Sequence, residues 1–293
     1  MCIVYTPFLF SEVSTAIILF RQSGGPIGDM LFTAHYMFHQ KLLGNTVLAA
    51  IPTTLNPEIK KLYENLTFID GIIELDFFLD DEKFLFYCSE MGYLPCRFLL
   101  DTQYLRGLNF QAFNNGTNCW FMNPVAPSID TRNAIGFQVS IANHYDRPVV
   151  SNLNAYIDLV IEAGLEPVFF GTKKDECLFI NSYPALAALY SDSDFSWRFG
   201  KDGILQTMAN IRNLRGHIVF SSGTSPMAVF QGVPVLELWT KDQWQFFSPM
   251  IHYMMGSPIH HITQSYEESP SPHLIKGIFP RLKMLSQNLY NIK

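Results

Sequence analysis

The chain has 293 residues, of which 48% are hydrophobic and 16% charged, and its formal net charge is −6 at pH 7. This length suits one large or two medium domains, and the composition is typical of a globular chain with ample core. Nucleic-acid binding needs clustered Lys and Arg to neutralise phosphates, so the acidic balance argues against such a partner. The five cysteines are odd in number and form no C-x-x-C pair, which favours reduced thiols over a disulfide framework.

The first twenty residues are apolar, but no Lys or Arg precedes Arg21, and Glu12 interrupts the run. A secretory signal begins with a basic region, and a membrane span needs about 20 apolar residues. We therefore expect a cytoplasmic protein in which residues 1–14 extend from the first strand. The aromatic segments at 77–78 and 84–87 leave two interpretations open, core packing or contact with a lipid-linked acceptor at the inner face of the membrane.

Short β-rich runs alternate with helical patterns along the first half of the chain. Strands are predicted at residues 16–20, 45–51, 71–75 and 119–122, and helices at 30–43 and 56–63. Asn56-Pro57 supplies an N-cap and a first helical residue for the second helix. The Pro- and Asn-rich segment 123–133 is the best linker candidate.

The alternation restarts after this linker. Strands are predicted at 134–139, 166–170, 217–220 and 233–238, helices at 151–163, 202–214 and 225–231, and a closing helix at 271–292. Strand–helix alternation with short loops predicts parallel sheets. The expected fold is therefore α/β, with two Rossmann-like domains facing each other, an N-terminal domain at 1–133 and a C-terminal domain at 134–293.

The first motif is Gly24-Gly25-Pro26-Ile27-Gly28-Asp29, between a strand and a helix. It is not G-x-G-x-x-G, and no acid follows about 20 residues later to bind a ribose, so a nicotinamide enzyme is disfavoured. Asp29 is interpreted either as a helix N-cap or as a functional acid at the carboxyl edge of the sheet, where open α/β folds bind ligands.

The second motif, Ser221-Ser222-Gly223-Thr224-Ser225, also joins a strand to a helix. Four hydroxyls and a glycine at a helix start suit a diphosphate, which the N–H groups and the helix dipole would attract. An N-cap would explain one or two of these hydroxyls. The absence of G-x-S-x-G argues against a serine hydrolase. No metal site is predicted, because the histidine pairs lack acidic or Cys partners at zinc spacing.

The two motifs together resemble glycosyltransferase family 9, the ADP-heptose:lipopolysaccharide heptosyltransferases. SGGPIGDMLFTAHYMFHQKL is similar to the opening of that family, whose first strand leads into a G-D-x-L-x-T helix, here Gly28 to Thr33. HIVFSSGTSPMAVFQGVPVLELW is similar to its second signature, a strand followed by [D]-[ST]-G, a helix and G-V-P. The resemblance covers about residues 15–245.

The resemblance implies a GT-B architecture, with the acceptor on the N-terminal domain and a nucleotide sugar on the C-terminal one. It implies an inverting transferase without a metal or other cofactor, whose donor is a nucleotide sugar, ADP-linked in the family, and whose acceptor is lipopolysaccharide or another surface glycan. Asp29 falls on the catalytic base, and Gly25, Gly28 and Thr33 belong to the acceptor-side loop. The residues implied to hold the donor are Arg147, Gly171, Thr172, Glu176, Ser221, Ser222, Gly223, Thr224 and Ser225.

Two residues depart from the family pattern. Ser221 stands where the family has a second acid, and Pro226 stands where it has a histidine. Fewer groups are then left to orient the sugar and the diphosphate. Two alternatives therefore stay open beside the transferase. One is a GT-B binding or scaffold protein with a residual sugar-nucleotide pocket, and the other is an isomerase acting on a nucleotide sugar, which would need additional acids in the cleft.

Overall fold

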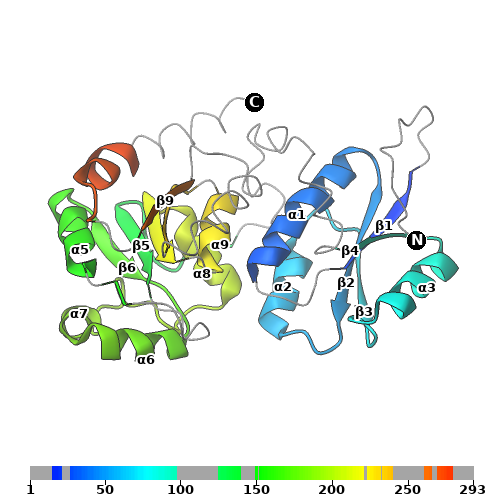
Figure 1. The fold of residues 1–293 in the computed structure, drawn as a ribbon, viewed down its shortest axis with the longest axis horizontal. Helices are drawn as coiled ribbons and strands as arrows, with labels where there is room; N and C mark the ends of the chain where they lie inside the picture. Colours follow the sequence, from blue (N-terminus) through cyan, green and yellow to red (C-terminus); the bar gives the residue numbers. More distant parts are fainter. Residues whose placement is uncertain are drawn as a thin grey trace.

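The computed structural model describes residues 15–21, 27–97, 125–139, 149–150, 152–220, 223–231, 233–239, 261–265 and 269–279 (Figure 1). Two parallel sheets organise these residues, one in each half of the chain. The α/β class predicted from the sequence is therefore confirmed, whereas the predicted strand at 119–122 lies outside the described residues.

The first sheet has the strand order β3-β2-β1-β4, and all of its pairs are parallel. Its elements, in chain order, are β1 (Ile17–Arg21), α1 (Ile27–Leu42), β2 (Thr46–Pro52), α2 (Pro57–Asn65), β3 (Gly71–Leu75), α3 (Asp81–Met91) and β4 (Leu94–Arg97). Asn56 caps α2 as predicted, because its side-chain oxygen accepts a hydrogen bond from the backbone N–H of Glu58.

The second sheet has the order β6-β5-β7-β8-β9, again with parallel pairs. Its strands are β5 (Ala134–Gln138), β6 (Glu166–Phe169), β7 (Gly216–Phe220), β8 (Val235–Trp239) and β9 (His261–Ser265). Its helices are α5 (Leu153–Glu162), α6 (Lys173–Ser182), α7 (Pro184–Tyr190), α8 (Ile204–Arg212) and α9 (Thr224–Phe230).

Both faces of the first sheet are covered, which suits the continuous apolar runs of its strands. On one face, Leu19 and Ala50 pack with Phe78, Phe84 and neighbours of α3. On the other face, alternate residues of the same strands pack against α1 and α2. Core packing therefore accounts for Phe78 and Phe84 in the aromatic segments. Leu79 and Phe86 are exposed, beside the acidic start of α3.

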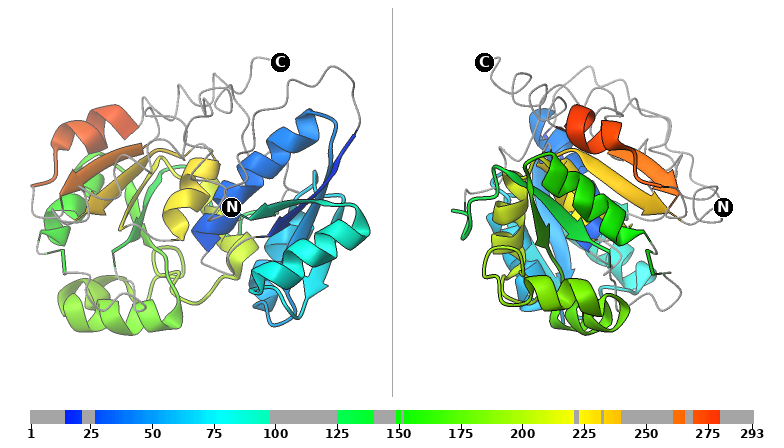
Figure 2. Two further views of the ribbon diagram at one scale, coloured as in Figure 1. Left: turned by 45° about the vertical axis from the view of Figure 1, so that its right-hand side comes forward. Right: turned by 90° about the vertical axis from the view of Figure 1, so that its left-hand side faces the viewer.

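The two halves are joined through a layer of helices. Helices α1 and α2 of the first half contact α9 and α8 of the second, and Figures 1 and 2 show these helices between the two sheets. One apolar cluster runs through this layer. It contains Met30 and Leu62 from the first half and Met208 and Met227 from the second. Buried apolar area, the main stabilising contribution in a core, is thus shared between the halves.

The opposite face of the second sheet carries α5, α6, α7 and a short π-helix, His273–Ile278. The π-helix packs against α5, where Lys276 Nζ donates to Glu162 Oε2 at 2.5 Å (Figure 2). This segment is the described part of the predicted closing helix, whose remaining length lies outside the described residues. The helix expected there is a π-helix over His273–Ile278.

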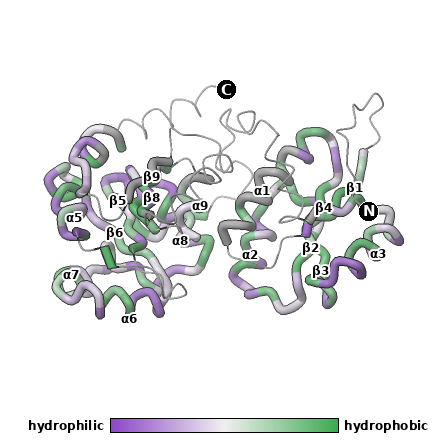
Figure 3. Tube along the Cα trace, viewed as in Figure 1, coloured by the Kyte–Doolittle hydropathy of each residue, from purple (hydrophilic) through white to green (hydrophobic). Residues whose placement is uncertain are grey.

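Hydropathy follows the layers: strands such as β2 and β5 are mostly hydrophobic, and hydrophilic residues gather at the starts of α3 and α6 (Figure 3). Among the described residues, no helix combines the length and apolarity needed to cross a membrane. Among the described cysteines, Cys88 and Cys177 are free thiols.

Candidate functional site

The glycine motif of the first half follows β1, the strand at which the order of strand addition in the sheet reverses. From β1 the chain crosses to β2 and β3 on one side, and β4 then pairs with β1 on the other. In open α/β sheets, ligands bind outside the carboxyl end of the strands at such a crossover point. Strand β1 ends there at Arg21, and α1 begins at Ile27. The topology thus puts the motif where a ligand site is expected.

Helix α1 begins at Ile27, so Gly28 and Asp29 are its second and third residues. Asp29 therefore belongs to the first turn rather than preceding the helix as an N-cap. A carboxylate in a first turn is favoured by the helix dipole. Thr33 lies one turn further along α1. Gly25 and the side chains of Asp29 and Thr33 lie outside the described part of the structure, so their roles stay predictions.

Arg21, the last residue of β1, holds the carboxyl end of this strand in place, a role that the sequence interpretation missed. Its guanidinium donates to the carbonyl oxygen of Phe78 at 3.1 Å, pairs with Asp81 and lies 4.6 Å from the ring centroid of Phe84. An arginine that ends an otherwise apolar strand is the available signal. Its partners lie about 60 residues away, so the sequence alone does not identify them.

The second sheet has its crossover point between β5 and β7. From β5 the chain crosses to β6 on one side, and β7, β8 and β9 follow on the other. The connections that leave β5 and β7 at this point contain the predicted donor residues Arg147, Ser221 and Ser222. All three lie outside the described residues. Gly223 directly precedes α9, and Thr224 and Ser225 are its first two residues.

The hydroxyl of Thr224 faces the sheet. It donates to Gln138 Oε1 at 2.5 Å and lies 2.9 Å from His217 Nε2. The three side chains are buried, so the start of α9 is tied to the carboxyl end of β5 and to β7. Ser225 is fully buried as well, and its Oγ has no hydrogen-bond partner among the described residues. A buried hydroxyl without a partner is costly and needs an explanation.

Gly171 and Thr172 lie just after β6, at the same sheet edge. Thr172 is the N-cap of α6 in a capping box with Asp175: Asp175 N donates to Thr172 Oγ1 at 3.3 Å, and Thr172 N donates to Asp175 Oδ2 at 2.7 Å. A Cβ on Gly171 would lie 2.8 Å from the ring of Phe199, so only glycine fits there. Both residues therefore lie at the carboxyl edge of the second sheet, where Thr172 caps α6 and Gly171 makes room for Phe199.

Glu176 lies in the first turn of α6, and both of its carboxylate oxygens have partners within the protein. Oε1 accepts from Trp197 Nε1 at 2.6 Å, and Oε2 accepts from Lys173 Nζ at 2.8 Å. Burial opposes the charge of Glu176, but these two hydrogen bonds outweigh it and hold the pKa of the carboxyl below its ordinary value. Glu176 is therefore an ionised acceptor with a fixed orientation.

Val150, which comes shortly after residues 140–148, is held by a hydrogen bond to the second half. Val150 N donates to the phenol oxygen of Tyr183 at 2.7 Å. Burial raises the pKa of Tyr183 to about 12, so the phenol stays protonated at neutral pH. The connection that contains Arg147 is therefore followed by a fixed contact between Val150 and Tyr183.

The linker is held by a buried polar network. Arg198 binds Asp202 with both Nε and Nη2, at 2.9 and 2.5 Å, and Asn210 Nδ2 donates to Asp202 Oδ2 at 3.0 Å. Ser128 N in turn donates to Asn210 Oδ1 at 2.9 Å. The linker therefore packs on α8 of the second half.

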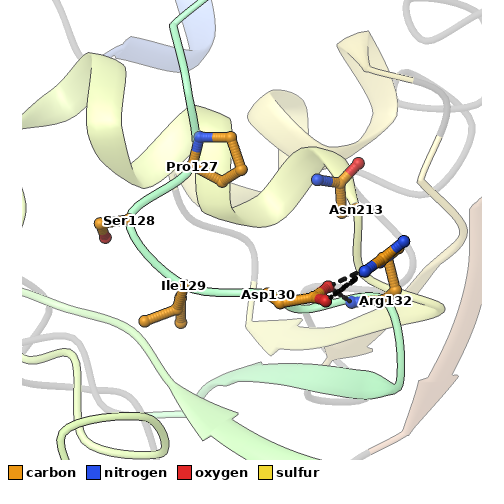
Figure 4. Close-up of a pocket in the computed structure, with 6 residues that line it drawn as sticks. All are labelled: Pro127, Ser128, Ile129, Asp130, Arg132 and Asn213. Atoms are coloured by element: carbon orange, nitrogen blue, oxygen red, sulfur yellow. Dashed lines mark hydrogen bonds and ion pairs between the residues drawn. The ribbon is translucent and has the colours of Figure 1, made fainter.

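An open hollow of about 370 Å³ lies beside this network. Figure 4 shows its lining residues, Pro127, Ser128, Ile129, Asp130, Arg132 and Asn213, among which Arg132 is paired with Asp130. None of the predicted site residues lines it. Across the described residues, no three His, Cys, Asp or Glu side chains gather closely enough to hold a metal ion.

Solved structures of very different sequence share this fold. A family 9 glycosyl transferase from Veillonella parvula matches with a TM-score of 0.56 and 14% identity, over 96% of this chain and 98% of that chain. The ADP-heptose lps heptosyltransferase II of E. coli matches with a TM-score of 0.54 and 13% identity, over 94% and 98%. The E. coli heptosyltransferase WaaC with ADP matches with a TM-score of 0.51 and 9% identity, over 93% and 100%.

No sequence model of a known family matches the chain, and no curated protein sequence matches it. The structural matches establish the fold: the chain has the GT-B fold of these glycosyltransferases, as its two motifs suggested. The domain boundary at residue 133 and the assignment of the site residues stay predictions.

Proposed function

We propose that the chain is a glycosyltransferase that moves a sugar from a nucleotide-sugar donor to a glycan acceptor, with inversion at the anomeric carbon and without a metal ion. The position of the two motif loops carries this proposal. Each loop follows the strand at the crossover point of its own parallel sheet. The fold that the chain shares with a family 9 glycosyl transferase and two heptosyltransferases supports it.

Asp29 is the proposed catalytic base. An acceptor hydroxyl is a weak nucleophile until its proton is removed, and a carboxylate within hydrogen-bond reach can take that proton during the attack. The new C–O bond forms on one face of the anomeric carbon while the bond to the diphosphate oxygen breaks on the other. The nucleoside diphosphate leaves with the electron pair of that bond, and the configuration at the carbon inverts.

The departing diphosphate needs positive charge or N–H donors to stabilise its developing charge. Arg147 is proposed to supply the charge, and Ser222, Gly223 and Ser225 the hydroxyl and N–H donors. The Oγ of Ser225, which lacks a partner among the described residues, supports a role for this loop in ligand binding. Thr172 and Glu176 are proposed to contact the nucleoside from the neighbouring connection.

The donor and the acceptor are proposed from the neighbours. Two of them are named as heptosyltransferases, one of ADP-heptose and lps and one with ADP. An ADP-linked heptose or a related sugar is therefore the first donor to test, and lipopolysaccharide or another surface glycan is the first acceptor class. A lipid-linked acceptor would bring the protein to the inner face of the membrane, and we place it in the cytoplasm.

A second candidate function is a binding or scaffold protein with the same fold. Ser221 and Pro226 favour it, because they replace the acid and the histidine of the family motif. Such a protein would keep nucleotide affinity without turnover. The two functions differ in chemistry and not in fold.

Nucleotide binding and product stereochemistry test the proposal. ADP, UDP, GDP and ADP-heptose are titrated against the full chain by calorimetry and thermal unfolding. A ligand at 100 times its dissociation constant stabilises the native state by about 2.7 kcal/mol. Transfer to a delipidated lipopolysaccharide core is then followed by NMR of the anomeric proton. Inverted product supports the transferase, binding without transfer supports the scaffold, and no binding by any nucleotide contradicts both.

A further inference from the structure

We propose that His217 and Gln138 are positioning residues that act through the hydroxyl of Thr224 to hold the donor loop where it enters α9, at residues 223–225, beside the crossover point of the second sheet. This role rests on the proposed function, because it assumes that the donor loop binds a nucleoside diphosphate. It adds two residues from neighbouring strands that belong to neither sequence motif.

Three elements meet at the Thr224 hydroxyl. Gln138 ends β5, His217 lies within β7, and Thr224 begins α9. Thr224 Oγ1 donates to Gln138 Oε1 at 2.5 Å, and His217 Nε2 lies 2.9 Å from the same oxygen. A hydroxyl has one proton to donate. Gln138 accepts this proton, and His217 Nε2 is the second hydrogen-bond partner of the hydroxyl.

The fold itself does not require these polar groups. The β7 run GHIVF and the β5 run AIGFQ are fully buried, where a β-branched residue would pack better than His217 or Gly136. Gly136 is the register partner of His217, and a Cβ at Gly136 would lie 2.4 Å from His217 Nδ1. A glycine in β5, which packs poorly, thus leaves room for an imidazole in the neighbouring strand β7. Local rules are broken in this way mainly at functional sites.

His217 is a fixed hydrogen-bonding group and not an acid or base. Complete burial lowers the pKa of its imidazole to about 3, although the backbone of Gly136 acts in the opposite direction. The ring is therefore neutral at physiological pH. Its described neighbours include the uncharged Thr224 and Gln138 and the ring of Phe170, at 5.9 Å between centroids. A ring that stays neutral at physiological pH keeps the same hydrogen-bond contact with the Thr224 hydroxyl.

A loop fixed in this way is pre-oriented for its ligand. Donors that already point toward the diphosphate need no ordering when it binds, which favours affinity, and their supporting hydrogen bonds keep them in place. The Thr224 side chain is turned toward the sheet, so it would orient the backbone of the loop and leave ligand contact to the neighbouring residues. Loss of its hydroxyl should weaken nucleotide binding while the base on the acceptor side stays intact.

Thr224→Val, which keeps the shape and removes the hydroxyl, is the test, with Thr224→Ser as the conservative rescue. Thr131→Val is the matched control. Thr131 of the linker is also buried, and its hydroxyl donates to the carbonyl oxygen of Asn210 at 2.6 Å, outside the donor loop. Gln138→Met is a second variant that removes the acceptor and keeps the side-chain length.

The dissociation constant of ADP, UDP or GDP, whichever binds the native chain, is measured by calorimetry together with KM and kcat for transfer. We expect Thr224→Val and Gln138→Met to raise the dissociation constant and KM about tenfold, the effect of one lost hydrogen bond, with kcat within threefold. Thr224→Ser and Thr131→Val should bind within twofold of the native chain. If Thr224→Val and Gln138→Met lose thermal stability as Thr131→Val does but bind normally, the positioning role is wrong. If the native chain binds none of these nucleotides, the proposed function fails first.

Discussion

Glu58 and Ile204 connect the two halves of the molecule: the backbone N–H of Ile204 donates to Glu58 Oε2 at 3.2 Å. Glu58 lies in the first turn of α2, and Ile204 begins α8. The N-cap residue of α8 is Gly203, which has no side chain to cap the helix. A carboxylate from one half therefore caps a helix of the other.

Replacing Glu58 by alanine should uncap α8. Hydrogen bonds from Lys61 and from Ile204 lower the pKa of Glu58, so its contribution to stability is present above pH 4.5 and is lost as the pH falls through the lowered value. Because the side chain is largely exposed, the loss should stay below about 1 kcal/mol. The sharper measurement is amide hydrogen exchange of Ile204, which should become faster in Glu58→Ala and not in Glu64→Ala. Unchanged exchange at Ile204 would show that this contact carries no energy.

Truncation of Leu62 tests the apolar layer between the halves. Leu62 is fully buried in the cluster shared by α2 and α8. Leu62→Ala leaves a cavity and should reduce the free energy of unfolding by about 2–5 kcal/mol, whereas exposed Leu42→Ala should change it by less than about 0.5 kcal/mol. Because the halves share this cluster, the native chain should unfold in urea as one transition by both fluorescence and circular dichroism. Two separate transitions would mean that the halves are energetically independent.

The Arg198–Asp202 pair should be sensitive to loss of one partner. Asp202 has a side-chain exposure of 4%, and Arg198 of 10%. Asp202→Asn would leave the buried guanidinium without its counter-ion, which costs about 3–5 kcal/mol. Asp130→Asn, at the exposed Asp130–Arg132 pair of the linker, should change the free energy of unfolding far less, because solvent screens an exposed pair. Urea denaturation measures the change in the free energy of unfolding of each variant. Equal changes in the two variants would contradict the structural role of the buried network.

Acid should destabilise the protein before its carboxylates titrate. The pKa of His217 is about 3 in the folded protein against 6.5 as its ordinary value, so the unfolded chain binds the extra proton below pH 6.5. Stability contributed by the neutral ring is present above pH 6.5 and falls toward pH 3, by up to about 1.4 kcal/mol per pH unit. The free energy of unfolding is measured between pH 7 and 5, above the range in which carboxylates such as Asp130 change charge. His217→Asn should reduce the slope over this window, and an identical slope in both proteins would contradict a buried neutral histidine.

Much of the fold was predictable because both sheets are buried on two faces. Apolar runs such as the one at β7, followed by glycine turns and amphipathic helices, predict parallel strands directly. Strand β4 was missed because it contains Pro95, which normally argues against a strand; β4 lies at the edge of its sheet, where proline is tolerated. Strand β9 was missed because HITQS is short and mostly polar.

The candidate site was predictable only where it is local. Gly28 with Asp29, and Ser222 with Gly223, are motifs that the sequence shows directly. Gln138 and Thr224 are 86 residues apart, and Arg21 and Asp81 are 60 apart, so only the pairing of strands and the packing of helices brings each pair together. The local signal for a special role of His217 was its position within the otherwise apolar run GHIVF. Without the register that pairs it with Gly136, it could not be told from an ordinary core residue.

The most direct test of glycosyl transfer by this chain is the turnover of Asp29→Asn at saturating donor, with Asp158→Asn on the exposed face of α5 as the control. Loss of a general base lowers kcat by about 10²–10⁴-fold. We predict a loss of this size in Asp29→Asn, with nucleotide affinity within twofold of the native chain and with full turnover in Asp158→Asn. Native turnover in Asp29→Asn would contradict the assignment of the base and, with it, the proposed mechanism.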